Sequence, residues 1–229
     1  MRFSAVAFDL DGTLYPNYRF YIRLIPFLLK EQRYLRAFGK VRDRIRKEDS
    51  EGKSENSYTF YQRQAMYMAE ILKKDPVFLA EQTEKNIYRG WEPLFNNLKL
   101  FPHVKETLIS LKDKGIKLGL LSDFPPETKI ENLELSGYWD TVLCSEVIGN
   151  LKPDPLPFNE LCRAMGFPPE KILYVGNSFY YDVLGAKKAG MKTAWIIPKI
   201  KYKLEGTKVK RKADFVFYDY RQLYAFVLI

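Results

Sequence analysis

Two aspartates one residue apart, Asp9 and Asp11, follow a short apolar run near the start of the chain. An apolar run without alternation is typical of a buried strand in a parallel sheet. Ligand sites in open α/β sheets lie at the carboxyl ends of such strands, where both carboxylates would point roughly the same way. Because burying two like charges is costly unless a cation or protons offset them, the pair predicts a divalent-metal site.

The residues around this pair support a binding loop. Gly12 permits a backbone conformation that a side chain would forbid, and Thr13 offers a hydroxyl just beyond it. A second apolar run ends at Ser122 and Asp123, which places another hydroxyl at a strand end. A calcium loop would explain the aspartates differently, but the further oxygen ligands that such a loop needs are missing from this stretch.

The elements that must position these residues alternate from residue 98 onward. Apolar runs predict strands, and helical patterns that end at glycines separate them. The strands are expected at residues 116–121, 141–144, 172–175, 193–197 and 215–218. The pattern predicts a doubly wound α/β core with a parallel sheet and right-handed crossovers.

Residues 16–92 differ from this core, because their apolar residues recur at helical spacing and strand-like runs are absent. We expect one or two helices over residues 18–38, with Pro26 marking a kink or break. A short basic helix over residues 41–47 and a polar loop over residues 49–56 should follow. The block therefore reads as a helical insertion (residues 16–92) in a core formed by residues 1–15 and 93–229.

Four stretches of the chain resemble the motifs of the haloacid dehalogenase (HAD) superfamily of aspartate-nucleophile hydrolases, in the family order. Residues 9–14, Asp-Leu-Asp-Gly-Thr-Leu, resemble the first motif, and Ser122 after Leu120-Leu121 resembles the second. Lys152, followed by Pro153-Asp154-Pro155, resembles the third. Residues 175–190 resemble the fourth, which usually reads Gly-Asp with a second Asp five residues later. Here the first of those aspartates is Asn177, and the second is Asp182.

The resemblance implies a Rossmann-like HAD core in which residues 16–92 form a C1-type cap over the site. It also implies magnesium-dependent hydrolysis of a phosphate monoester through an aspartyl-phosphate. Asp9 would be the nucleophile, and Asp11 would protonate the leaving alkoxide and then deprotonate water. Ser122 and Lys152 would hold the charge that develops on the phosphoryl oxygens.

The same resemblance implies the binding residues. The phosphate site would comprise Leu10, Gly12, Thr13, Ser122, Asp123 and Lys152. The Mg²⁺ ligands would be Asp9, Asp11 through its backbone carbonyl, Asn177, and Asp182 directly or through water. Asn177 offers an oxygen but no charge, so the metal should be held more weakly than by a carboxylate.

Two other functions compete with a phosphatase. A 2-haloacid dehalogenase also uses an aspartate nucleophile, needs no metal, and has an Asn in the fourth motif. Those relatives typically lack the second aspartate, however, and this chain has Asp11. A non-catalytic phosphate-binding protein with the HAD fold is favoured only by Asn177. An assay with a generic aryl phosphate and magnesium separates these hypotheses.

The net charge and the composition limit which substrates and partners can be expected. The chain has 229 residues and a net charge of +9, which suits an anionic substrate. Residues 16–92 carry 16 Lys or Arg against 11 Asp or Glu, so we expect a small phosphorylated substrate with a second anionic group. A basic run at residues 199–212 should be an exposed loop, but nucleic acid is not an expected partner because no recognised module accompanies it.

No apolar run approaches the roughly 20 residues that a membrane helix needs. The chain enters its first strand directly, and its two cysteines suggest no disulfide framework, so we expect a cytoplasmic protein. No sequence feature indicates the oligomeric state or the physiological substrate.

Overall fold

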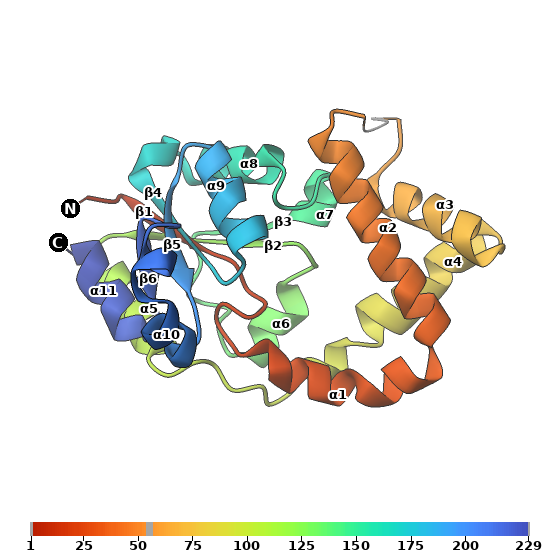
Figure 1. The fold of residues 1–229 in the computed structure, drawn as a ribbon, viewed down its shortest axis with the longest axis horizontal. Coiled ribbons are helices and arrows are strands. Elements are labelled where there is room, and N and C mark those ends of the chain that lie inside the picture. The colour runs from red at the N-terminus through yellow and green to blue at the C-terminus, as the bar shows by residue number, and fades with distance from the viewer. Residues whose placement is uncertain (1, 54–56, 229) are drawn as a thin grey trace.

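The computed structural model describes residues 2–53 and 57–228, and in this part of the chain six parallel strands form one sheet (Figure 1). The strand order is β3-β2-β1-β4-β5-β6, so β1 lies between β2 and β4 near the middle. The strands are β1 (Ala5–Phe8), β2 (Lys117–Ser122), β3 (Thr141–Cys144), β4 (Ile172–Gly176), β5 (Lys192–Ile196) and β6 (Phe215–Phe217). The predicted doubly wound α/β core is confirmed.

Alternate residues of β1 point to opposite faces of the sheet, as the pleat requires. Val6 and Phe8 join one apolar cluster with α5 (Val104–Asp113) and α11 (Tyr220–Leu228). Ala5 and Ala7 join a second cluster with α8 (Pro155–Met165) and α9 (Gly185–Lys188). Both faces are therefore covered by helices (Figure 1), which explains why β1 is apolar throughout its length.

Short elements complete the core around the sheet. They are α6 (Glu127–Asn132), α7 (Ser145–Ile148), a 3₁₀ turn η3 (Pro169–Lys171), a π-helical turn η4 (Phe179–Leu184) and α10 (Lys199–Lys210). Helices α6 and α7 follow β2 and β3 respectively, so they begin at the edge of the sheet where the strands end.

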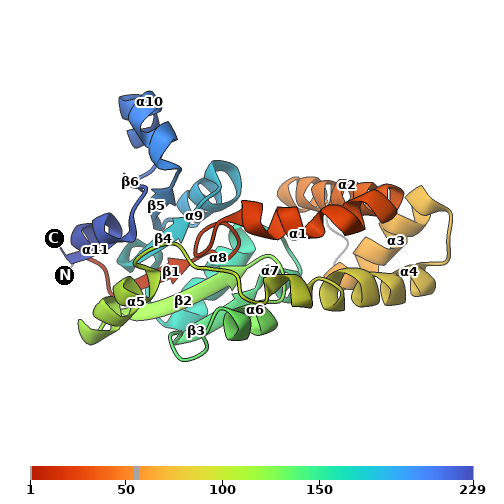
Figure 2. The same cartoon turned by 90° about the horizontal axis from the view of Figure 1, so that it is seen from below.

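The insertion between β1 and α5 is helical. It contains α1 (Asn17–Lys30), α2 (Gln32–Ser50), α3 (Phe60–Leu72), α4 (Pro76–Thr83), the π-helical turn η1 (Glu84–Arg89) and the 3₁₀ turn η2 (Glu92–Phe95). Buried residues of α2, α3, α4 and η1 form an apolar cluster of their own, which also takes in Leu151 of the core. Figure 2 shows these helices extending to one side of the sheet.

The structure sharpens one expectation for the insertion and corrects another. Of the kink or break expected at Pro26, the break is excluded, because the helix continues through the exposed Pro26 and ends at Glu31, where φ is −118°. Proline removes one hydrogen bond, and water can satisfy the freed carbonyl on an exposed helix face. The short helix expected at residues 41–47 is part of α2, which runs on to Ser50. Of the loop expected at residues 49–56, residues 54–56 lie outside the described residues.

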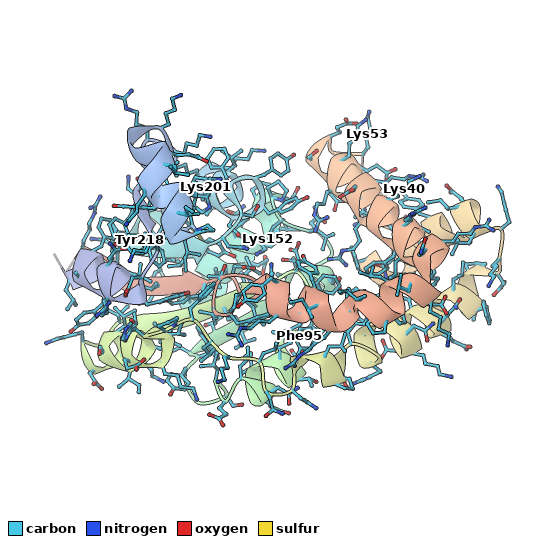
Figure 3. The ribbon with its side chains drawn as sticks, turned by 60° about the horizontal axis from the view of Figure 1, so that its bottom comes forward. Lys40, Lys53, Phe95, Lys152, Lys201 and Tyr218 are labelled. Atoms are coloured by element: carbon cyan, nitrogen blue, oxygen red, sulfur yellow. The ribbon has the colours of Figure 1, made fainter. Side chains whose placement is uncertain are left out.

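The basic run at residues 199–212 was expected to be a loop, but most of it is the helix α10 (Figure 2). Val209 is buried in an apolar cluster with Trp195 and Ile197, and the half-buried Tyr202 packs against that cluster. These two residues are seven apart and so lie on one helix face. Their spacing could have indicated a helix in the sequence. The many lysines around them, such as Lys201 in Figure 3, favoured the interpretation as a loop.

In residues 2–53 and 57–228, the structure contains no helix with the length and hydropathy required to span a bilayer.

Candidate active site

The carboxyl ends of three neighbouring strands bring the predicted site residues together. Phe8, the last residue of β1, pairs with Leu120 of β2 and with Val175 of β4. Asp9 therefore follows β1 beside Ser122 at the end of β2, and Asn177 follows directly after β4. The parallel register thus places the first, second and fourth motifs at one edge of the sheet.

The carboxylate of Asp9 is buried, and both of its oxygens are held by neighbouring side chains. Lys152 Nζ lies 2.7 Å from Oδ1, and the Thr13 hydroxyl donates a 2.7 Å hydrogen bond to Oδ2. Burial disfavours the charged form more than Lys152 favours it, and Asp182 adds repulsion, so the pKa of Asp9 is raised to about 7. The two contacts orient the carboxylate, but Lys152 alone does not offset the cost of burying its negative charge.

Lys152 is the cation at the centre of the site and is only 3% exposed (Figure 3). Its Nζ also lies 2.8 Å from Asp182 Oδ1 and 3.3 Å from the Tyr174 hydroxyl oxygen. Burial opposes the charge of Lys152, but Asp182 and Asp9 together raise its pKa well above the ordinary value. Lys152 therefore stays protonated between two buried carboxylates.

Asp182 lies behind Lys152, where its carboxylate is fully engaged. One oxygen accepts from Lys152 Nζ, and the other accepts a 2.9 Å hydrogen bond from the backbone N–H of Ser178. Asp182 is 2% exposed. The sequence predicted Asp182 as a metal ligand, directly or through water, and this stays a prediction. In the structure its carboxylate contacts Lys152 and the Ser178 N–H.

Asn177 packs against the loop that follows β1. A Cβ atom added to Gly12, whose φ is +85°, would come within 2.2 Å of Asn177 Nδ2. The Thr13 hydroxyl lies 3.5 Å from Asn177 Oδ1. Glycine at position 12 therefore supplies both the left-handed backbone and the space that lets the fourth motif reach the first.

The oxygens that the sequence assigned to a cation have partners of their own in this structure. Those of Asp9 contact Lys152 and Thr13, the Asp11 carbonyl accepts a 3.4 Å hydrogen bond from Asn17 Nδ2, and Asn177 Oδ1 lies near the Thr13 hydroxyl. By type, a carboxylate, a carbonyl and an amide oxygen suit a hard cation. Within the described part of the chain, no three His, Cys, Asp or Glu side chains are grouped as a metal site. Any cation here would rely on an amide and a backbone carbonyl as well as on Asp9.

Asp11 has a different set of partners from Asp9. Its Oδ1 accepts a short hydrogen bond from the Tyr15 hydroxyl, and its Oδ2 lies 2.6 Å from Lys129 Nζ. Burial, first of all, and the charge of Asp11 raise the pKa of Tyr15 well above its ordinary value, so Tyr15 remains a donor. Asp11 is therefore held at the edge of the site rather than inside it.

Lys129 is a site residue that the sequence reasoning missed. It lies on α6, 118 residues from Asp11, and is 6% exposed. Its Nζ also lies 4.8 Å from the ring centre of Phe95 and 5.2 Å from that of Phe124. No motif surrounds Lys129, so only the packing of α6 against the site reveals it.

Ser122 and Asp123 occupy the places expected from the end of β2. Ser122 is fully buried, and its hydroxyl oxygen accepts a 3.2 Å hydrogen bond from the backbone N–H of Phe124. Asp123 accepts hydrogen bonds from the backbone N–H of Lys152 at 3.2 Å and from Arg46 Nη2 at 3.0 Å. Although burial opposes its charge, Lys152 and Arg46 lower the pKa of Asp123. Asp123 thus fastens the loop that carries Lys152.

Three arginines of the insertion contact the core beside Lys152, and sequence reasoning missed all three. Arg46 Nε lies 3.0 Å from the carbonyl oxygen of Lys152, and Arg63 Nη2 lies 2.7 Å from that of Gly149. Arg42 forms a buried ion pair with Glu146. Basic residues from α2 and α3 therefore bind the segment between β3 and α8 instead of facing open solvent.

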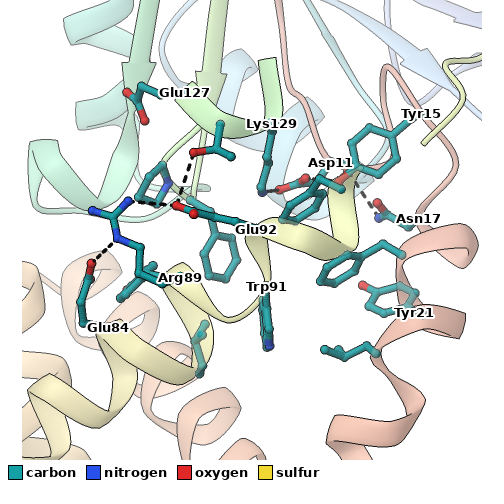
Figure 4. Close-up of a pocket in the computed structure, with 18 of the residues that line it drawn as sticks. Asp11, Tyr15, Asn17, Tyr21, Glu84, Arg89, Trp91, Glu92, Glu127 and Lys129 are labelled. Atoms are coloured by element: carbon teal, nitrogen blue, oxygen red, sulfur yellow. Dashed lines mark hydrogen bonds and ion pairs between the residues drawn. The ribbon is translucent and has the colours of Figure 1, made fainter. Parts of the chain in front are cut away.

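A cavity of about 720 Å³ lies between the insertion and the core, and Asp11, Tyr15 and Lys129 form one end of it (Figure 4). The rest of the wall is largely aromatic and aliphatic. It comes from α1, η1 and η2 of the insertion and from the core segment between β2 and α6. Asp11 is thus the catalytic candidate that faces this space.

The basic residues of the first long helices do not line this cavity. The sequence suggested that they would bind a second anionic group of the substrate; they are Arg19, Arg23, Lys30, Arg33 and Arg36. Arg23 instead donates hydrogen bonds to the carbonyl oxygens of Leu94 and Asn96. Of the basic residues of the insertion, Arg89 lines the cavity, and these five do not.

Comparison with known proteins gives a family match over most of the chain. The model of the haloacid dehalogenase-like hydrolases matches residues 3–190. The chain is 35% identical over 132 residues to a glyceraldehyde 3-phosphate phosphatase of Pyrococcus furiosus, covering 56% of this chain and 55% of the relative. It is 35% identical over 143 residues to a phosphoglycolate phosphatase of Haemophilus influenzae, covering 60% and 61%. The matched part spans little more than half the length of these curated relatives.

Solved structures share the whole fold. A 2-haloacid dehalogenase of Pseudomonas syringae pv. tomato has a TM-score of 0.68 at 23% identity, covering 99% of this chain and 98% of that one. A HAD phosphatase of Thermococcus onnurineus has a TM-score of 0.63 at 23% identity, covering 98% and 97%. At this identity the likeness shows the fold, which dehalogenases and phosphatases have in common.

Proposed function

The chain belongs to the haloacid dehalogenase-like hydrolases, and on that premise we propose that it hydrolyses a phosphate monoester through an aspartyl-phosphate on Asp9. The observation that carries the proposal is the contrast between the two aspartates. Asp9 is buried and oriented by Lys152 and Thr13, whereas Asp11 faces the cavity. The curated relatives named as phosphatases support the same reaction class.

In the first step, an oxygen of Asp9 attacks phosphorus, and the bond from phosphorus to the ester oxygen breaks. Asp11 takes up a proton before this step, and the oxygen that carries it then no longer accepts from Tyr15 or Lys129. Protonated Asp11 gives that proton to the departing ester oxygen, so an alcohol rather than an alkoxide leaves and Asp11 becomes ionised.

Lys152 and Ser122 stabilise the charge on the transferring group. Lys152 Nζ carries a positive charge beside Asp9 Oδ1, which neutralises the nucleophile before attack and the phosphoryl oxygens during it. The Ser122 oxygen accepts from the Phe124 N–H, so the hydroxyl proton is available to a phosphoryl oxygen. Backbone amides of residues 10–12 form the remaining part of the anion site, together with Thr13.

In the second step, water attacks the phosphorus of the aspartyl-phosphate. Asp11, now ionised, takes the proton of that water, and the carboxylate of Asp9 is restored. Asp182 takes part through Lys152, because its carboxylate holds the ammonium group from behind.

The oxygen donors near the loop fit a hard divalent cation, and we propose Mg²⁺. Asp9, the backbone carbonyl of Asp11 and Asn177 would hold it, and when bound it supplies positive charge to the nucleophile and phosphate.

A dehalogenase activity is disfavoured by the placement of Asp11. A proton donor held over the leaving-group cavity assists the departure of an alcohol, whereas a halide leaves without protonation. The dehalogenase structures that share the fold are too distant in sequence to weigh against this observation.

The test is a turnover assay with an aryl phosphate and Mg²⁺, together with a rapid-quench experiment using a radiolabelled phosphate ester. The wild type should release phosphate and carry label on the protein in a bond that hydroxylamine cleaves. Asp9→Asn should show neither signal while keeping the wild-type circular dichroism spectrum. Phosphate release by the Asp9→Asn variant at a rate near that of the wild type would refute the covalent mechanism.

A further inference from the structure

The cavity between the insertion and the core has an apolar wall that phosphate hydrolysis as such does not require. The rings of Phe20 and Phe95 stack with centres 4.9 Å apart, and Trp91 meets Phe20 edge to face at 5.5 Å. These residues are joined along the wall by Leu24, Ile87 and Phe124. The result is a continuous aromatic and aliphatic surface, seen around Trp91 in Figure 4.

The position of Asp11 indicates which part of a substrate meets this wall. In the proposed reaction Asp11 protonates the ester oxygen, so the alcohol portion must lie on the Asp11 side of the phosphorus. Asp11 and Lys129 form the polar end of the cavity, and their ion pair lies beside Phe95. The alcohol that leaves the phosphorus on the Asp11 side therefore occupies the apolar cavity.

The charges in the cavity argue against a second anionic group on that alcohol. Its described lining contains four acidic residues, which are Asp11, Glu84, Glu92 and Glu127, and two basic residues, which are Arg89 and Lys129. Arg89 is paired with Glu84 at 2.9 Å and with Glu92 at 3.0 Å, and Lys129 is paired with Asp11 (Figure 4). A carboxylate entering here would meet excess negative charge and two cations that are already paired.

We propose that the substrate is a phosphate monoester of an uncharged, apolar alcohol of aromatic size. The inference rests on the proposed phosphatase function and names the substrate class of that same site. The cavity of about 720 Å³ falls in the range of roughly 300–1,000 Å³ that small-molecule sites occupy, so one or two rings fit inside it. This proposal replaces the expectation that the substrate carries a second anionic group, because the basic side chains of α1 and α2 do not line the cavity.

The experiment compares three primary-alcohol esters, so that leaving-group chemistry stays nearly constant. They are ethyl phosphate, 2-phenylethyl phosphate and the phosphate ester of 3-hydroxypropanoate. Burial of the phenyl ring should raise kcat/KM roughly 30-fold or more over ethyl phosphate. The carboxylate ester should be hydrolysed more slowly than ethyl phosphate. Equal or better turnover of the carboxylate ester would overturn the inference and leave the phosphatase function standing. Absence of turnover with all three esters and with an aryl phosphate would overturn both.

Two tyrosines on α1 provide a matched pair of variants. Tyr21 is 56% exposed and lines the cavity, whereas Tyr18 is 58% exposed and does not. Tyr21→Ala should lower the ratio of kcat/KM for the phenylethyl and ethyl esters by about 3- to 10-fold. Tyr18→Ala should leave this ratio at the wild-type value. The same ratio in both variants would mean that the apolar wall does not contact the alcohol, which overturns the inference.

The charge of the cavity is tested separately with Glu92→Gln. This change removes one negative charge while keeping an acceptor for Arg89 and Thr128. The ratio of kcat/KM for the carboxylate and ethyl esters should rise a few-fold, and the phenylethyl ratio should stay as it was. A carboxylate ratio that does not rise would show that the excess negative charge does not set specificity.

Discussion

The two aspartates of the first motif lie in contrasting regions of the molecule. Around Asp9 every contact comes from the core, and the partners are polar and buried: Thr13, Lys152 and, behind it, Asp182. In front of Asp11 the cavity is shared by the core and the insertion, and its wall is aromatic. In the proposed reaction, the region around Asp9 acts on the phosphoryl group, whereas the region around Asp11 accepts the alcohol.

The contrast teaches which changes should affect all substrates and which should depend on the alcohol. Charges near Asp9 act on the phosphoryl group, which every substrate shares. Groups near Asp11 act on the leaving oxygen and its carbon skeleton, which differ between substrates. Variants in the first region should therefore lower kcat for all esters alike, and variants in the second should change the ranking of esters.

Lys152→Met should lower both stability and activity, because it leaves Asp9 and Asp182 buried without their shared cation. Removing one partner of a buried ion pair costs about 3–5 kcal/mol of unfolding free energy, and kcat should fall by about 10²–10³ for every ester. Urea unfolding and steady-state rates measure the two effects. The exposed Lys40 on α2 is the control, and Lys40→Met should change stability by less than about 0.5 kcal/mol. A loss of activity confined to one ester would break the proposed contrast.

Asp11→Asn removes the proton donor and should lower kcat/KM for alkyl phosphates by about 10²–10⁴. Esters of acidic phenols should lose less, because a phenolate leaves without being protonated. The two classes of ester therefore serve as each other's control in one set of rate measurements. An equal loss for both would show that Asp11 acts on the phosphoryl group, as Asp9 and Lys152 do.

Asp9→Asn should change the stability of the metal-free protein, relative to the wild type, in a pH-dependent way. The pKa of Asp9 is about 7 in the folded protein and about 3.8 in an unfolded chain, so the folded state binds more protons between these values. The contribution of Asp9 to the stability of the wild type therefore falls as pH rises from about 4 to 7, by at most a few kcal/mol. Thermal unfolding with a chelator should show the variant gaining over the wild type across this window. A constant difference in Tm from pH 4 to pH 8 would contradict the raised pKa.

Arg46→Ala should weaken the contact between the insertion and the core beside Lys152. The guanidinium contacts the Lys152 carbonyl and Asp123, and charged hydrogen bonds of this kind are each worth about 1.5–3 kcal/mol. We expect kcat/KM to fall about tenfold for all esters, because Lys152 loses part of its support. Arg33→Ala, at an exposed position of the same helix, should leave the rates unchanged. A change in the ranking of the esters would instead show that Arg46 acts on the alcohol in the cavity.

Asn177→Asp should have the smallest effect, a several-fold tighter affinity for Mg²⁺. The variant adds a negative charge beside Gly12 and Thr13, where the proposed cation lies. The measurement is a magnesium titration with and without beryllium fluoride as a phosphate analogue. The wild type should bind the metal more tightly when the analogue is present. If the variant binds no more tightly in either condition, residue 177 lies outside the metal shell.

The sequence by itself determined the core and the residues at its strand ends. Asp9, Ser122 and Asn177 follow apolar runs, and parallel strands bring their carboxyl ends to one edge, so the spacing alone predicts that they meet. Sequence alone also indicated a helical insertion after the first motif, because apolar residues recur there at the spacing of an amphipathic helix. The one long segment misread as a loop was α10, where the lysines outnumber the two residues that pack, Tyr202 and Val209.

The tertiary structure alone decided what each side chain faces. Lys129 reaches Asp11 across 118 residues, and Asp182 turns to Lys152 because η4 directs it there. The basic side chains of α2 fasten the insertion to the core instead of lining the cavity, which leaves aromatic residues to form its wall. Local spacing fixes which residues share a helix face, but the element that this face meets depends on how distant segments pack, and that packing sets the chemistry of the cavity.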